Sequence, residues 1–236
     1  MRAPRGKALA GTLAVVSVAA FGATYLLFFT PEAPAPVTLN GPEDQSPASA
    51  ELDNFDPVGT WAVQQGSEAG YRVREKLARL PAPSDAVGRT TAVEGGFVLS
   101  GEAGRYSVSD IRIRVDLTRL TSDSPRRDNA LRERGLETDR FPTATFSSAG
   151  PLEIPDQVRG GQPVELTLSG ELMIHGVTRK VSIPVEAQLA SPRIQVVGSM
   201  TIPMADFGIE PPSVANIVSV EPTGTLEFDL ILEKAV

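Results

Sequence analysis

The sequence predicts an all-β protein: an antiparallel β-barrel of about eight strands with one short helix, preceded by a single N-terminal transmembrane helix. Three observations predict this class. From Trp61 onward apolar residues recur at every second position, a single stretch there has helical composition, and the chain begins with a long uncharged run. Alternation with a period of two is typical of antiparallel sheets that have one buried face.

The N-terminal run, residues 8–31, carries no charge and exceeds the roughly 20 apolar residues that cross a bilayer. Arg2, Arg5 and Lys7 precede it, and basic flanks stay in the cytoplasm. We therefore expect residues 1–7 in the cytoplasm, a single-pass anchor in the cell membrane, and an extracytoplasmic remainder.

A cleaved signal peptide is the competing interpretation of this run, because it shares the basic start. The run is longer than the usual apolar region of a signal peptide, about 7–15 residues. The small-residue candidate cleavage site, Ala33-Pro34-Ala35, is followed by Pro36, which is a poor context for cleavage. These features favour the uncleaved anchor.

Residues 32–56 are rich in Pro, Ala and Ser and carry acidic but no basic side chains. Such a composition does not bury enough apolar surface to fold, so we expect a disordered linker. The remainder, residues 57–236, is expected to form one barrel domain.

The longest alternating segment runs from Val164 to His175. At about 3.3 Å per residue it would span roughly 40 Å, whereas a typical strand has about 5–6 residues. A long, tilted strand fits a closed barrel, with Gly170 as a point where it bends. A β-sandwich is the alternative architecture.

Two local features interrupt the strands. The stretch SPRRDNALRERGLETDRFP predicts the short helix, which Pro125 opens and Gly135 closes. The parity of the apolar residues flips at His175-Gly176, which predicts a tight hairpin turn with a positive φ at Gly176. His175, the single histidine of the chain, is therefore interpreted as a solvated turn residue.

The residues that carry most enzyme chemistry are missing. The chain has no cysteine and one histidine, which excludes thiol catalysis and a multi-histidine metal site. Neither a nucleophile elbow nor a phosphate-binding or dinucleotide-binding glycine motif occurs. We therefore expect no enzyme activity, no metal and no cofactor. The mildly acidic domain also makes nucleic acid a poor partner.

Three segments resemble the YceI-like polyisoprenoid-binding family: RRDNALRERGLETDRFPTATF, LSGELMIHGVTRKVSIPVEA and IPMADFGIEPP, in that order. They match its R-D…L to F/Y-P…T-F segment, its G-x-L-x-I-x-G-V-T hairpin and its late D-F-G-I. The resemblance covers about residues 59–234 and implies a lipocalin-like barrel that holds a quinone or polyprenyl chain, without enzyme activity. This chain departs from the family at Ala130, often histidine there, and at Gly135–Leu136, which lacks an aromatic pair.

The leading hypothesis is thus a membrane-tethered extracytoplasmic carrier for an isoprenoid lipid. The alternative is an extracytoplasmic protein-interaction domain with a solid core, and a third hypothesis is an enzyme that uses buried carboxylates. Arg127 is a candidate for contact with an anionic head group. The expected ligand-binding residues are Arg127 and, from the alternating faces, Phe97, Ile113, Val115, Phe146, Leu168, Leu172, Ile174, Val185, Ile202 and Phe228.

Overall fold

The computed structural model describes residues 33–39, 55–77, 83–102, 105–155, 161–190, 192–211 and 218–235. The expected transmembrane segment, residues 8–31, lies outside these ranges, as do residues 40–54 of the expected linker. Among the described residues no helix has the length and hydropathy that crossing a bilayer requires.

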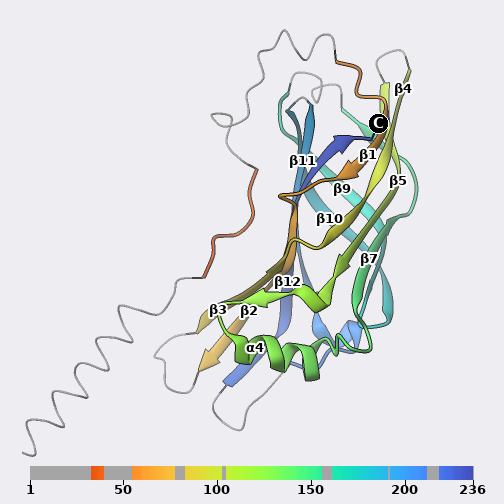
Figure 1. Ribbon diagram of the computed structural model, residues 1–236. Coiled ribbons are helices and arrows are strands. Elements are labelled where there is room, and N and C mark those ends of the chain that lie inside the picture. The colour runs from red at the N-terminus through yellow and green to blue at the C-terminus, as the bar shows by residue number, and fades with distance from the viewer. Residues whose placement is uncertain are drawn as a thin grey trace, which may run out of the picture. The chain divides into compact units, whose positions relative to one another are not determined.

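Eight of the described strands form a closed antiparallel ring, which confirms the predicted barrel (Figure 1). The ring closes where the first strand pairs with the last, with Trp61 opposite Lys234. In spatial order its strands are β1 (Gly59–Val63), β4 (Val93–Glu102), β5 (Arg105–Asp116), β7 (Thr143–Ser148), β9 (Val164–Ile174), β10 (Val177–Ala190), β11 (Arg193–Pro203) and β12 (Val218–Lys234).

The long strand β12 pairs with β11 along one edge and with two strands along the other. Its C-terminal end pairs with β1, whereas residues 218–229 pair with β2 (Glu68–Leu77). The sheet then continues outward through β3 (Ser84–Thr90) to β6 (Thr121–Ser122). A short strand, β8 (Leu152–Ile154), pairs with β5.

The hairpin between β9 and β10 has the predicted tight turn. Ile174 lies opposite Val177, so the turn consists of His175 and Gly176, whose φ angles are 53° and 73°. Two positive φ angles are the pattern of a type I′ turn, whose twist matches that of the flanking strands. This turn explains the parity flip in the sequence.

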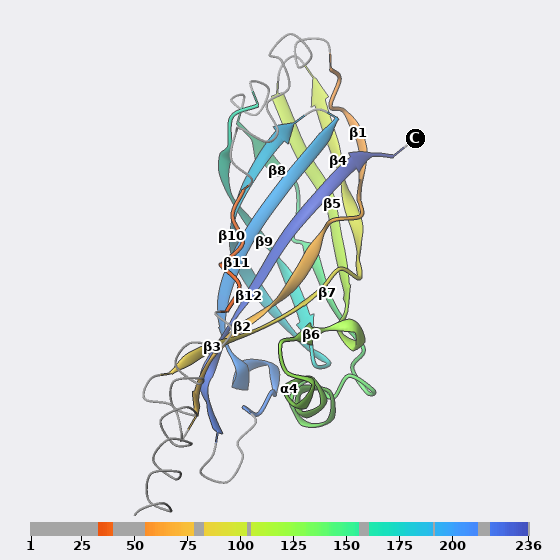
Figure 2. The same ribbon diagram turned by 60° about the vertical axis from the view of Figure 1, so that its left-hand side comes forward.

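The predicted helix lies across one end of the barrel (Figures 1 and 2). It consists of α4 (Pro125–Ala130) and a π-helical turn, η2 (Leu131–Gly135). Ser124 caps it, because its hydroxyl accepts a hydrogen bond from the Arg127 backbone N–H. Two 3₁₀ turns, η1 (Leu117–Arg119) and η4 (Met204–Phe207), complete the described helical elements.

Pro34 and Ala35 of the expected linker contact the outside of the barrel. The Nη2 groups of Arg72 and Arg89 donate hydrogen bonds to the carbonyl oxygens of Pro34, at 2.7 Å, and Ala35, at 2.8 Å. Figure 2 draws this segment in red-orange. Disorder of the rest of the linker stays a prediction.

Candidate functional site: the barrel cavity

The barrel encloses a cavity of about 750 Å³. That volume lies within the range of about 300–1,000 Å³ that is usual for small-molecule sites. Its walls are mostly aliphatic and aromatic side chains from the inward faces of the ring strands and of β2. The described part of the barrel therefore does not have the solid core that the interaction-domain alternative requires.

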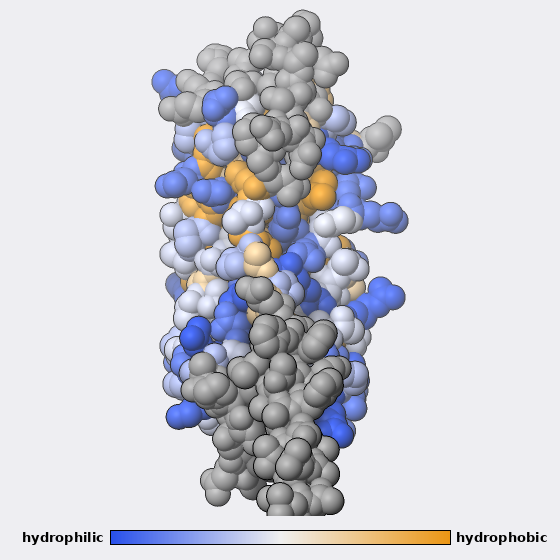
Figure 3. All heavy atoms as spheres, turned by 90° about the vertical axis from the view of Figure 1, so that its left-hand side faces the viewer, coloured by the Kyte–Doolittle hydropathy of each residue, from blue (hydrophilic) through white to orange (hydrophobic). Residues whose placement is uncertain are grey.

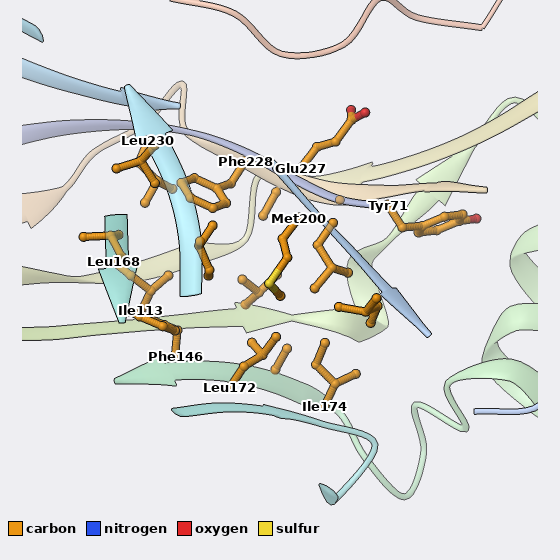
Figure 4. A pocket seen from close by; sticks show the side chains of 18 of the residues that line it. Tyr71, Ile113, Phe146, Leu168, Leu172, Ile174, Met200, Glu227, Phe228 and Leu230 are labelled. Carbon is orange, nitrogen blue, oxygen red and sulfur yellow. The ribbon is translucent and has the colours of Figure 1, made fainter. Parts of the chain in front are cut away.

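Strand β12 shows the hollow interior most directly. Leu226 and Phe228 point into the cavity and are only half-buried, because their surface faces empty space. Glu227 lies between them on the opposite face and is 4% exposed. Leu230 and Leu232, further along the same face, are 6% and 1% exposed, so the free space lies beside Leu226 and Phe228 and not along the whole strand. Figure 4 shows Phe228 among the cavity residues and the Glu227 carboxylate directed away from them.

All eleven residues expected to bind a ligand lie in the wall of this cavity. Figure 4 shows six of them, namely Ile113, Phe146, Leu168, Leu172, Ile174 and Phe228. Their contact with a ligand stays a prediction. A bend at Gly170 stays a prediction. A Cβ there would lie 2.2 Å from the Ser147 carbonyl oxygen and 2.6 Å from Cζ of Phe146, so the glycine allows close approach of both.

Sequence reasoning missed two polar residues of the cavity wall, Tyr71 and Glu75. Both lie on β2 with Ala69 and Val73, which also line the cavity and alternate with the outward-facing Arg72 and Arg74. Tyr71 and Glu75 have the same parity as the apolar residues Ala69 and Val73, and this parity indicates an inward direction. It was missed because a glutamate in an alternating strand resembles a solvent-exposed residue.

Arg127 approaches the cavity from α4 and is held by carboxylates. Its Nε and Nη2 atoms donate to the two carboxylate oxygens of Glu75, each at 3.1 Å. Its Nη1 atom donates to Asp123 and to the Ser122 hydroxyl. Burial acts to lower the pKa of Arg127, but Glu75 and Asp123 outweigh it, so the pKa is raised and the guanidinium stays charged.

A second arginine–glutamate cluster lies on the outer face. Arg72 Nε donates to Glu227 at 2.6 Å, and Arg89 Nη2 lies 3.4 Å from the other oxygen of the same carboxylate. These are the arginines that bind the carbonyl oxygens of residues 34 and 35. Figure 3 shows one face of the molecule, which is mostly hydrophilic with a smaller hydrophobic group in its upper part.

The interpretation of His175 as a solvated residue is wrong. Its side chain is 11% exposed, and its ring lies 4.4 Å from the Phe141 ring, centroid to centroid. Nδ1 lies 3.3 Å from the carbonyl oxygen of Phe207, and Nε2 lies 3.4 Å from a carboxylate oxygen of Glu137. The turn is as predicted, but η4 and the segment before β7 fold over it.

The carboxylates in the described residues are not arranged for metal binding, since no cluster of three or more possible ligands occurs there. Burial raises the pKa of Asp229, while a hydrogen bond from Gln195 opposes the shift. Asp229 has the outward parity of Glu227, so it does not face the cavity. The carboxylate that does face it, Glu75, is paired with Arg127.

Comparisons with known proteins agree on the fold. The sequence profile of the YceI-like domain matches residues 61–232. A UPF0312 protein of Vibrio vulnificus is 28% identical over 141 residues, which cover 57% of this chain and 70% of the relative. A similar UPF0312 protein of Vibrio parahaemolyticus has the same identity and coverage.

Two solved structures share the fold at low sequence identity. A polyisoprenoid binding domain from Saccharophagus degradans superposes with a TM-score of 0.56 at 19% identity, over 75% of this chain and 99% of that one. BcnA from Burkholderia cenocepacia has a TM-score of 0.51 at 16% identity, over 72% of this chain and 98% of that one.

Proposed function

Since the chain belongs to the family of YceI-like domains, we propose that it binds an isoprenoid lipid, such as a quinone or a polyprenyl chain, by its tail. The observation that carries this proposal is the apolar cavity of about 750 Å³ inside the barrel. The Saccharophagus degradans domain with the same fold is described as polyisoprenoid binding, which supports the same ligand class here.

The energetics of the cavity suit a flexible, uncharged tail. Such a tail offers few hydrogen-bonding groups, so a protein holds it by removing apolar area from water. At about 25 cal/mol per Å², a tail that hides several hundred Å² gains on the order of 10 kcal/mol before ordering costs. A carrier needs no catalytic group, and the role we propose is transport or sequestration without chemistry.

The proposal includes a position at the cell membrane. The basic residues 1–7 and the uncharged residues 8–31 support a single-pass anchor with a cytoplasmic N-terminus and an extracytoplasmic barrel. Protease added to intact spheroplasts should then digest residues 57–236. Digestion only after lysis would contradict this orientation.

The ligand is tested by extraction. The full chain, purified gently in a mild detergent, should yield about one isoprenoid lipid per protein in an organic extract analysed by mass spectrometry. Leu168 is half-buried and faces the cavity. Leu168→Trp should abolish binding of this lipid while the protein remains folded. In a solid core the same change would overpack and destabilise by roughly 1–3 kcal/mol.

Thr167→Trp is the matched control, because Thr167 is exposed and precedes Leu168 on the same strand with the opposite parity. This variant should retain the lipid. An empty extract from the wild-type chain, together with no binding of added isoprenoids, would support the interaction-domain alternative instead.

A further inference from the structure

The cavity changes character at the end near α4. Most of the wall is apolar, but Tyr71, Glu75, Ser124 and Arg127 line it together. Figure 4 shows Tyr71 apart from the apolar residues, with its hydroxyl directed away from Leu230 and Phe228. A lipid that fills the cavity with its tail would bring a polar head to this end.

The cation at this end is already neutralised. Arg127 makes a two-point contact with Glu75 and a further ion pair with Asp123, so each of its three nitrogen atoms has an acceptor. An anionic head group would have to displace a carboxylate from this fork. The expectation that Arg127 meets an anionic head therefore loses its support.

The charges around Arg127 also disfavour an anionic head group. Asp128 adds a third carboxylate, which accepts hydrogen bonds from the Ser122 backbone N–H, at 3.0 Å, and hydroxyl, at 2.6 Å. Arg126 also lines the cavity but is exposed, so solvent screens its charge. Glu75 and Asp123 both contact Arg127, so a phosphate beside this arginine would meet two carboxylates already in place.

Tyr71 supplies a hydrogen-bond donor that nothing in the described residues uses. Its ring fits beside Gly88 of β3, where a Cβ would lie 2.4 Å from a ring carbon. Burial raises the pKa of its phenol, which Arg127 partly opposes, so the hydroxyl keeps its proton at neutral pH. A partly buried hydroxyl at the wall of an apolar cavity gains from a partner that accepts its hydrogen bond.

We propose that this end of the cavity selects an isoprenoid with a neutral head that accepts a hydrogen bond from Tyr71, such as a carbonyl or hydroxyl oxygen, over a phosphorylated one. This inference rests on the proposed function, because it needs the tail to occupy the cavity. Tyr71 determines specificity, and the Arg127–Glu75 pair excludes negative charge.

The test uses the full chain and four probes that share one geranylgeranyl tail: a naphthoquinone, the alcohol, the monophosphate and the hydrocarbon without a head. Each competes for a fluorescent geranylgeranyl analogue. The quinone and the alcohol should bind tighter than the hydrocarbon, and the monophosphate weakest. If no probe competes, the proposed function itself fails. Equal binding of all four, or tightest binding of the monophosphate, overturns the head-group inference alone.

Two variants sharpen the result. Tyr71→Phe should weaken the quinone about three- to tenfold, as expected for one hydrogen bond, and leave the hydrocarbon unchanged. Tyr106→Phe is the matched control, because Tyr106 on β5 lies outside the cavity wall. Glu75→Gln should remove one of the two carboxylates that bind Arg127 and so increase the affinity for the monophosphate. An unchanged quinone affinity in a folded Tyr71→Phe variant would overturn the assignment of Tyr71.

Discussion

The two arginine–glutamate clusters of the barrel use the same chemistry on opposite faces of the sheet. Glu75, 9% exposed, faces the cavity end and pairs with Arg127 from a helix. Glu227, 4% exposed, faces outward and pairs with Arg72 and Arg89 from neighbouring strands. Beside the inner cluster, the Tyr71 hydroxyl lines the cavity without a partner among the described residues. The two arginines of the outer cluster instead donate hydrogen bonds to the carbonyl oxygens of residues 34 and 35.

The difference shows that burial of a carboxylate in this protein does not follow the face of the sheet. An outward-facing glutamate is more buried than an inward-facing one. The worth of each ion pair should therefore rank with the burial of its carboxylate, since unpairing a buried charge costs more than unpairing a solvated one.

The largest effect is expected at Glu227. Glu227→Leu removes the carboxylate that two arginines share, although Arg72 keeps Asp85 and Arg89 keeps Glu68 as partners. It should lower the free energy of unfolding by about 3 kcal/mol in urea denaturation. Glu233→Leu is the matched control on β12, because the 36% exposed Glu233 pairs with Arg193 near the surface. Its loss should be about 0–1 kcal/mol, and equal losses at the two sites would break the ranking by burial.

A smaller loss is expected at the inner cluster. Glu75→Leu should cost about 1–3 kcal/mol, because Arg127 keeps Asp123 and Ser122 as partners. Urea denaturation beside Glu227→Leu checks the order of the two. A larger loss for Glu75→Leu would mean that the face of the sheet, and not burial, determines how much stability each ion pair contributes.

His175 extends the comparison to the hairpin turn. Its ring packs on Phe141, so His175→Asn should cost about 1–2 kcal/mol in thermal or urea unfolding. Asparagine is suitable because it tolerates the φ of 53° better than other residues, which isolates the loss of the ring from backbone strain. A change within about 0.5 kcal/mol would restore the view of His175 as a surface residue.

The smallest effect concerns Glu137, whose side chain is 31% exposed. The hydrogen bond from Arg140, and secondarily His175, lowers the pKa of Glu137 in the folded protein. Its stabilising contribution is therefore present above the ordinary glutamate pKa of about 4.3 and is lost as the pH falls through the lower folded value. Glu137→Gln should be slightly less stable than wild type at pH 7, and the difference in stability should shrink as the pH falls below the ordinary glutamate pKa. Unfolding followed by urea denaturation over a series of pH values checks this. A difference in stability that stays constant as the pH falls would contradict this assignment.

Much of the fold was predictable because it depends on local pattern. Alternation identified the strands, Pro125 and Gly135 bounded the helical segment, and the parity flip located the turn at His175-Gly176. Ten of the eleven wall residues, all but Arg127 on α4, were predictable for the same reason, since the period of a strand determines which side chains share a face. The anchor at residues 8–31 stays a prediction from composition.

The sequence by itself determined which residues face inward, and only the tertiary structure decided what they face. Alternation reports the direction of a side chain but not the distance to the opposite wall, so it does not distinguish a cavity from a packed core. The Arg127–Glu75 pair joins residues 52 positions apart, and the Glu227 cluster joins three strands. Charged residues in alternating strands resemble solvated ones until chain closure brings their partners together, and His175 is buried for the same nonlocal reason.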